Sequence, residues 1–346
     1  MLCRAAKADA TSLRPAIPAR ISFTAGQSEV TLRIFMSHGT AKRNTRRLLA
    51  GCLALACLVH GPVTSIASEP VTESRTEERF IPNYAAGELY YLWSTRADLE
   101  GSEASLQVQE AGTRIPVPIF SNERSRLTAG VDFRWNGLDF SSPDRTLNLY
   151  RLQVPIDFWH EFNDRWKAWG RVEPGLFTDF KDLNPDAFAV TVLALASYQF
   201  SPAFSAAFGV YYSRDLGEDR VLPALGLIWK PNPHWNVGLT FPRASVSYAP
   251  TKQWLFTALV APGGAGWSVK DDLTGEDYRL NYTSWRAGLS AEYQFTQVGP
   301  AKMWVFLSGG YQFGQELEIQ DGDDHTLSKQ DVENAQFVSG GVRLRF

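Results

Sequence analysis

The side chains best suited to metal chemistry are the acidic cluster Asp321, Asp323 and Asp324 with the adjacent His325. Carboxylate oxygens are the ligands that Ca²⁺ prefers, and this cluster is compatible with weak binding. It lacks the spaced glutamate that completes a calcium-binding loop. We therefore interpret the cluster as an acidic, solvated loop, and the sequence predicts neither a metal site nor a cofactor.

Nucleophilic catalysis by a hydroxyl requires a histidine within hydrogen-bond reach. After residue 67 the sequence contains three histidines, His160, His234 and His325, and none shares a strand-like segment with a serine or carboxylate at catalytic spacing. No His-x-Ser sequence occurs. The sequence therefore predicts no enzyme, and a lipid-modifying enzyme stays as a remote alternative.

Ten charged side chains share a different feature: each alternates with apolar residues along a strand-like segment. A strand turns alternate side chains to one face, so these charges would face the interior of a closed sheet. There they must be paired or hydrated, since burying an unpaired charge is costly. They would form either a salt-bridge network that fills the interior or a hydrated, charge-lined channel. The ten are Asp132, Arg134, Arg151, Asp157, Arg171, Glu173, Arg286, Glu292, Arg343 and Arg345.

The elements that would position these charges are strands with period-two alternation. In residues 126–138, Leu127, Val131 and Trp135 alternate with Asp132 and Arg134. No competing helical periodicity is long enough to matter. The other strand-like segments are 88–94, 103–114, 147–158, 165–180, 188–200, 204–214, 221–230, 254–260, 282–295 and 303–317. This pattern predicts an all-β fold, a transmembrane antiparallel up-and-down β-barrel.

The connections alternate between short turns and longer acidic loops, as in barrels with short periplasmic turns and longer outer loops. The short set includes 201–202 and 250–253, and the long set includes 270–277 and 320–331. Apolar parity switches at Phe241-Pro242-Arg243. A reversal there gives about fourteen strands and a β-bulge about twelve. The alternation of connections favours fourteen.

The two ends of the chain point to one compartment. Residues 335–346 form an amphipathic strand closed by an aromatic residue, which is how outer-membrane barrels of Gram-negative bacteria end, so Val342, Leu344 and Phe346 are the expected signal for the barrel-assembly machinery. Basic residues and a short apolar run precede a small-residue site ending at Ala67, the layout of a signal peptide. We predict an N-terminal extension plus signal peptide (1–67, with Met36 as the expected start), a periplasmic lead (68–101, with a first strand as an open alternative) and a barrel (102–346).

Removal of residues 1–67 changes the charge and the cysteine content. That segment holds nine of the 34 Lys/Arg and two of the 37 Asp/Glu, which leaves 25 basic and 35 acidic side chains, a net charge of −10. Nucleic acid is disfavoured as a partner by this sign. All three cysteines also lie in the removed part, which excludes disulfides and cysteine-ligated metals from the remainder.

An ordered set of short motifs carries a family resemblance. The set comprises residues 170–180 (Gly-Arg-Val-Glu-Pro-Gly-Leu-Phe-Thr-Asp-Phe), 198–202, 211–215, 222–226, 229–233, 241–243 with Tyr248, and 309–311. Together these motifs resemble a family of uncharacterised proteobacterial outer-membrane β-barrel proteins, known as a domain of unknown function. The resemblance covers roughly residues 103–346 and implies an outer-membrane barrel without assigning an activity.

The functional prediction is a passive pore or transport-type barrel with a charge-lined lumen, located in the outer membrane after signal-peptide cleavage. The alternative is a closed structural or surface-interaction barrel that uses its acidic outer loops. The expected partners are outer-membrane lipid, the barrel-assembly machinery and, in the first hypothesis, small solutes. The solute, the oligomeric state and the openness of the lumen are left undetermined by the sequence.

Overall fold

The computed structural model describes residues 20–25, 28–33, 80–82, 85–142, 144–271, 274–299 and 301–345. The predicted signal peptide with its cleavage site, and the terminal Phe346, lie outside these residues. The chain divides into two compact units. In the first, β1 (Arg20–Ala25) and β2 (Ser28–Arg33) form a two-stranded antiparallel sheet. The second is a closed β-barrel.

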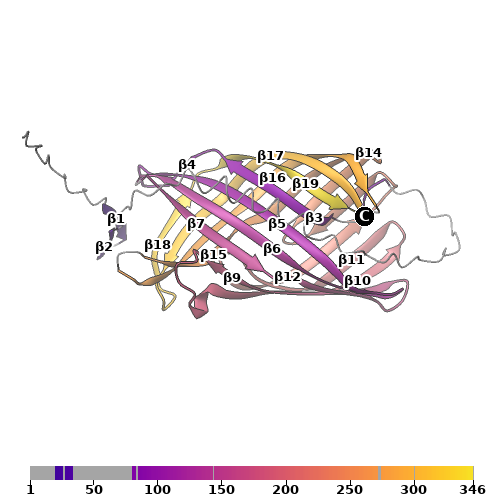
Figure 1. Ribbon diagram of the computed structural model, residues 1–346, viewed down its shortest axis with the longest axis horizontal. Helices are drawn as coiled ribbons and strands as arrows, with labels where there is room; N and C mark the ends of the chain where they lie inside the picture. Colours follow the sequence, from indigo (N-terminus) through magenta and orange to yellow (C-terminus); the bar gives the residue numbers. More distant parts are fainter. Residues whose placement is uncertain are drawn as a thin grey trace, which may run out of the picture. The chain divides into compact units, whose positions relative to one another are not determined.

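Seventeen strand segments build the barrel in chain order, and β19 pairs with β3 to close the ring (Figure 1). The ladders between successive positions of the ring are antiparallel, as the sequence predicted for an up-and-down barrel. The segments are β3 (Ala85–Ser94), β4 (Ala97–Asp98), β5 (Ser105–Ser121), β6 (Ser125–Ser141), β7 (Asp144–Gln153), β8 (Ile156–Glu161), β9 (Trp166–Thr178), β10 (Phe188–Ser201), β11 (Phe204–Leu216), β12 (Glu218–Trp229), β13 (Trp235–Thr240), β14 (Ala244–Thr251), β15 (Trp254–Lys270), β16 (Asp277–Val298), β17 (Ala301–Gln320), β18 (Thr326–Val332) and β19 (Ala335–Arg345).

Three of these strands are interrupted, so the ring has fourteen positions. β3 and β4 both pair with β5, β7 and β8 both pair with β6 and β9, and β18 and β19 both pair with β17. Counting each couple once reduces the seventeen segments to fourteen. The deciding feature is the reversal at residues 241–243, where Leu239 pairs with Ala244. The chain turns back there, and the bulge alternative is wrong.

The barrel wall separates an apolar outer face from a polar inner face. On β16 and β17, Leu289 is 71% exposed and Leu307 is 63% exposed, whereas Glu292 on the opposite face is buried. Such an outer face suits hydrocarbon, because it would be costly in water. Among the described residues the only helical turn is Pro185–Ala187, and no helix is long and apolar enough to cross a membrane.

One end of the barrel, here called the loop end, carries the connections 179–187, 271–276 and 321–325. The other, the C-terminal end, carries Arg345 and the short turns. At the loop end β15 leaves its neighbour: its pairing with β14 stops at Val260, and Ser268 instead pairs with Thr178 of β9. Gly264, with φ +101, lies at this departure. The ring is therefore narrower at the loop end than in the middle.

An apolar core fills this narrowed loop end. Its central members are almost completely buried and come from strands around the ring, including β5, β6, β7, β9 and β15. They are Leu106, Leu138, Leu149, Phe177 and Trp267. Cores packed at protein density leave few voids larger than a water molecule. Apolar side chains therefore occupy the barrel interior at its loop end.

In the described part of the chain, the apolar contact at the C-terminal end lies on one side of the barrel. Ile81, from the segment preceding the barrel, packs with Ala249, Leu255 and Trp304 of the neighbouring strands β14, β15 and β17. Phe80 lies beside the His234 ring, with 4.1 Å between centroids. This part of the predicted periplasmic lead thus lies against the barrel wall, and β3, within residues 68–101, is the first barrel strand.

Candidate functional site in the barrel lumen

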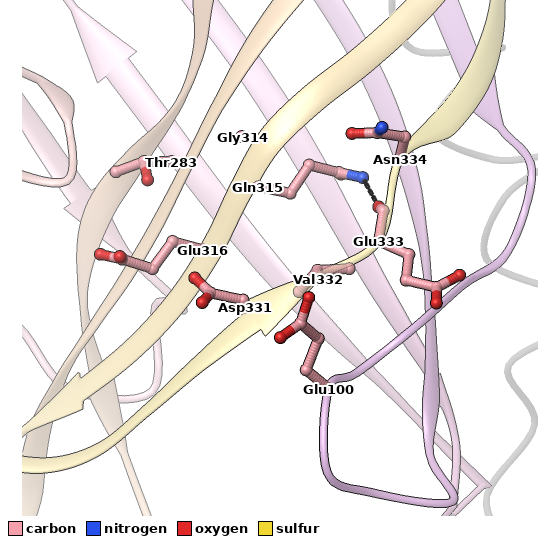
Figure 2. Close-up of a pocket in the computed structure, with 9 residues that line it drawn as sticks. All are labelled: Glu100, Thr283, Gly314, Gln315, Glu316, Asp331, Val332, Glu333 and Asn334. Carbon is pink, nitrogen blue, oxygen red and sulfur yellow. Dashed lines mark hydrogen bonds between the residues drawn. The ribbon is translucent and has the colours of Figure 1, made fainter.

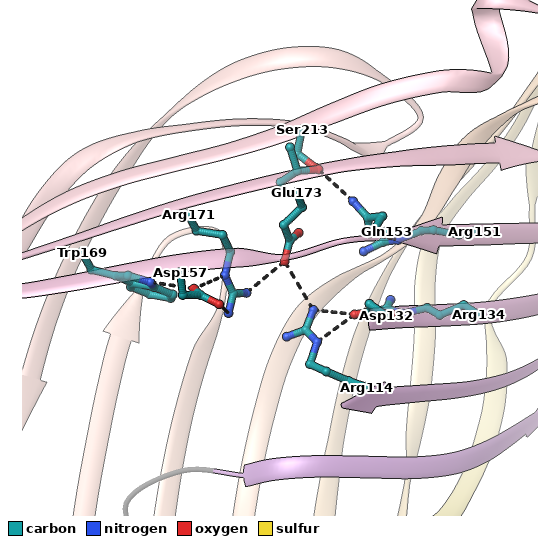
Figure 3. A network of polar contacts seen from close by, with 11 residues as sticks. Arg114, Asp132, Arg134, Arg151, Gln153, Asp157, Trp169, Arg171, Glu173 and Ser213 are labelled. Atoms are coloured by element: carbon teal, nitrogen blue, oxygen red, sulfur yellow. Dashed lines mark hydrogen bonds and ion pairs between the residues drawn. The ribbon is translucent and has the colours of Figure 1, made fainter. Parts of the chain in front are cut away.

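The first group of lumen charges gathers around two carboxylates on β6 and β9 (Figure 3). Arg114 lies 2.5 Å from Asp132 and 3.6 Å from Glu173, measured between nitrogen and oxygen. Arg134 approaches Asp132 to 3.4 Å. Glu173 also lies 3.3 Å from Arg171. Two buried carboxylates thereby connect three strands of the wall.

Arg171 extends this group to β8. Its guanidinium donates to both oxygens of Asp157 at 2.5 and 3.0 Å, the two-pronged geometry in which arginine binds carboxylate most strongly. The indole Nε1 of Trp169 donates to the same carboxylate at 2.9 Å, and the guanidinium also lies over the Trp169 ring. Asp157 is therefore fully engaged by its neighbours.

A polar branch continues from β7 to β11. Arg151 donates to Gln153 at 2.5 Å, and Gln153 donates to Thr191 at 3.4 Å. Thr191 and Ser213 share a longer contact of 3.5 Å. All four side chains are buried, and Figure 3 shows Arg151, Gln153 and Ser213 facing the same space as the ion pairs.

A second group surrounds Glu110 on β5. Arg286 donates to it at 3.0 Å, Asn136 donates to it at 3.4 Å, and the Tyr90 hydroxyl donates to it as well. Arg286 comes from β16, far from Glu110 in sequence, so this contact crosses the lumen.

A third group lies nearer the C-terminal end. Glu292 accepts hydrogen bonds from both Arg343 and Arg345, at 2.5 and 2.7 Å. Arg343 also bridges to Glu88 at 2.8 Å and covers the Phe306 ring at 3.9 Å from its centroid. One buried carboxylate thus holds two arginines of the last strand.

The structure therefore brings the predicted lumen residues together in three layers. Their partners in these layers include Arg114, Glu110 and Glu88, which the sequence had not indicated. The arginines keep contact with solvent: the side chain of Arg114 is 34% exposed and that of Arg134 is 31% exposed. Buried carboxylates against partly exposed guanidinium groups make the middle of the barrel interior polar, beside a loop end that is apolar.

Arg243 is a lumen residue that the sequence analysis placed only in a family motif. It follows the cis peptide bond Phe241–Pro242 in the reversal between β13 and β14. On β14 the odd-numbered Ala249 is buried inside, whereas Tyr248 faces outward. Counting back from Ala249 in steps of two residues leads to Arg243. This alternation was the sequence signal that would have identified Arg243 as inward-facing.

A serine–histidine contact was also missed. Ser125 Oγ lies 2.9 Å from His160 Nδ1, because these residues are directly opposite on β6 and β8. Residue spacing along a single strand gives no signal for a pair that forms across two strands. His160 is flanked by the rings of Phe158 and Phe162. Among the described contacts no carboxylate orients its other nitrogen, so the pair lacks the third group that nucleophilic catalysis uses.

The acidic cluster of the 321–325 loop is used for local structure. The Asp321 carboxylate accepts hydrogen bonds from the backbone amides of Asp323 and His325, both at 2.9 Å. These donors, above all the amide of His325, hold the pKa of Asp321 below its usual range. Asp324 pairs with Arg279 at 2.6 Å. In the described part of the chain no group of three ligand-type side chains is arranged to hold a metal ion.

A cavity of about 650 Å³ lies where β18 gives way to β19 (Figure 2). Its charged lining is acidic: Glu100, Glu316, Asp331 and Glu333. Glu316 is paired with Lys329 at 2.9 Å, and Gln315 donates to the backbone of Glu333. The cavity is an acidic surface depression, separate from the lumen groups.

Comparison with known proteins gives a family and a fold. Residues 84–345 match the protein family described as a domain of unknown function (DUF6268). No curated protein matches the sequence. Similar solved structures include the toluene transporter TodX of Pseudomonas putida (12% identity, TM-score 0.37, covering 77% of this chain and 90% of that one) and OccK7 (OpdD) of Pseudomonas aeruginosa (8%, 0.31, 75% and 99%). A porin of Rh. blastica is also similar (10%, 0.23, 76% and 100%). These similarities concern the barrel architecture alone.

Proposed function

The chain belongs to the DUF6268 family, and we propose that it is a transport-type β-barrel of the Gram-negative outer membrane with a charge-lined lumen. The observation that carries this proposal is the set of arginine–carboxylate contacts inside a fourteen-position barrel. A ring of this size leaves interior room that side chains alone need not fill. Small solutes would pass the arginine and carboxylate layers, which set selectivity through their local field.

The loop end makes this a gated barrel in our proposal, because the apolar core blocks a permanently open axial path. The element placed to move is the end of the β15–β16 hairpin, beyond Gly264. Its attachment to β9 is small and polar: the Ser268 backbone accepts from the Asp179 amide at 3.3 Å, and Lys270 pairs with Asp182 at 2.5 Å. These polar contacts are weak compared with a strand ladder, so the main attachment of this element is the burial of Trp267 in the apolar core.

The proposal includes the cellular setting predicted from the sequence. The C-terminal strand, with Val342 and Leu344, would be read by the barrel-assembly machinery, and the signal peptide would be removed on export. The apolar outer face would contact outer-membrane lipid. The loop end would face the cell exterior, because the short turns lie at the opposite end.

The test is planar-bilayer conductance of the purified full chain. We expect discrete, low-occupancy openings, with the closed state dominant. A barrel that never conducts would contradict transport. The apolar core specifically favours one second candidate, a closed surface-interaction barrel. That candidate predicts no conductance together with a loss of cell-envelope integrity when residues 322–329 are deleted.

A further inference from the structure

We propose that Arg243 forms a binding site for a small oxyanion, such as a carboxylate or a phosphate, in the middle of the lumen. Its role as a waypoint for solutes depends on the proposed transport function, whereas the binding itself does not. The site would use a residue of the Phe241-Pro242-Arg243 motif that the ion-pair layers leave unused.

The fold presents Arg243 to the lumen at mid-height. The β13–β14 hairpin is short, and only four residues of β12 pair with β13, so its reversal lies part-way along the barrel wall and not at the rim. The Thr240 hydroxyl donates to the backbone carbonyl of Arg243, which fixes the turn and leaves the guanidinium unused. The residue is exposed to solvent.

The charges that act on Arg243 most strongly come from the opposite wall. They are Arg343, Glu88, Arg114 and Arg134, so three of the four are positive. The nearby carboxylates are already engaged: Glu88 with Arg343 at 2.8 Å, and Asp132 with Arg114 at 2.5 Å. Among the described residues no carboxylate lies within ion-pair distance of Arg243. It therefore adds a positive charge that no neighbour neutralises.

This surplus charge defines the ligand class. A guanidinium presents a planar fork of donors that matches the two oxygens of a carboxylate or phosphate. A unit charge pair at about 4 Å in water is worth ~1 kcal/mol, which corresponds to about fivefold in affinity. A solvated site of this strength exchanges its ligand quickly, as a site along a conduction path must.

The experiment uses ¹⁹F NMR of trifluoroacetate, a carboxylate, added to the full chain in zwitterionic detergent. We expect saturable line broadening with the wild type and at least about fivefold weaker binding with Arg243→Gln. Arg243→Lys keeps the positive charge but lacks the planar fork of donors, so its affinity for trifluoroacetate should lie between those of the wild type and Arg243→Gln. The matched control is Arg124→Gln, which removes an exposed arginine from the turn between β5 and β6 and should bind like the wild type. Inorganic phosphate should compete with trifluoroacetate.

Three results overturn the inference: no saturable broadening, equal losses in Arg243→Gln and Arg124→Gln, or no loss in Arg243→Gln. Folding is checked by the shift in gel mobility on heating, and Arg243→Lys replaces Arg243→Gln if the latter does not fold. Failure of the transport proposal can be distinguished from failure of the binding site. Trifluoroacetate binding without conductance would remove the transport proposal and keep the site, whereas conductance without binding would do the reverse.

Discussion

Truncation of Trp267 to alanine tests whether the apolar core closes the loop end. Trp267 is fully buried and belongs to the core that spans the ring. Removing a buried tryptophan side chain costs about 3–5 kcal/mol in free energy of unfolding. It also leaves a space that can admit water between walls that previously touched. We expect a lower urea midpoint of unfolding and, in planar bilayers, open occupancy raised several-fold.

Trp304 provides the matched control. It is 1% exposed, and its indole nitrogen, like that of Trp267, has no hydrogen-bond partner in the described residues. Trp304→Ala should therefore cost a similar free energy of unfolding, about 3–5 kcal/mol. Its apolar cluster lies on one side of the barrel and does not cross the lumen. Conductance that rises equally in both variants, or that stays unchanged in Trp267→Ala despite its lower stability, would refute the assignment of the core as the seal.

Three further predictions concern the charges. Glu292→Gln leaves Arg345 without its carboxylate and Arg343 with Glu88 alone. It should lower the free energy of unfolding by about 2–4 kcal/mol, less than the upper range for buried pairs because the arginines are partly exposed. Glu161→Gln, in an exposed pair, should cost less than about 1 kcal/mol by urea unfolding. Arg286→Gln should lower conductance in the Trp267→Ala background, and unchanged conductance there would remove this layer from the path. Lys270 holds the pKa of Asp182 below its usual range, so the link that attaches β15 is fully formed above the ordinary aspartate pKa and is lost as pH falls through the lowered value. Hydrogen-exchange protection factors, which correct for the intrinsic pH dependence of the rate, should fall at the 263–270 amides in acid and in Asp182→Asn, and protection independent of both would contradict the link.

The barrel itself was predictable because its signals are local. Alternation of side chains along single strands gives the two faces, and the alternating short and long connections give up-and-down topology. The parity switch at residues 241–243 fitted either a reversal or a bulge, and the alternation of short and long connections favoured the reversal. The structure confirms the reversal and the fourteen positions to which it leads.

The contacts within the lumen were not predictable, because they depend on how the strands are staggered around the ring. Alternation places Asp132 and Arg286 inward, but only the register shows that the first meets Arg114 and the second meets Glu110. The same limit hid the Ser125–His160 pair. The pairing of Ser268 with Thr178 joins residues ninety positions apart and has no local pattern at all.

The loop-end core shows why the charged layers bear on function. A closed structural barrel can fill its interior with apolar side chains, and this chain does so with Leu138, Leu149 and Trp267 at one end. Replacing buried ion pairs by well-packed apolar residues is often neutral or stabilising, so stability alone gives no reason to keep arginines and carboxylates in the middle. Both kinds of interior, apolar and charged, occur a few residues apart on β6, where Leu138 is buried and Arg134 is partly exposed. In the proposed function, charged layers beneath a removable apolar seal would give selective passage, and the Trp267→Ala and Arg286→Gln variants test the seal and the layers separately.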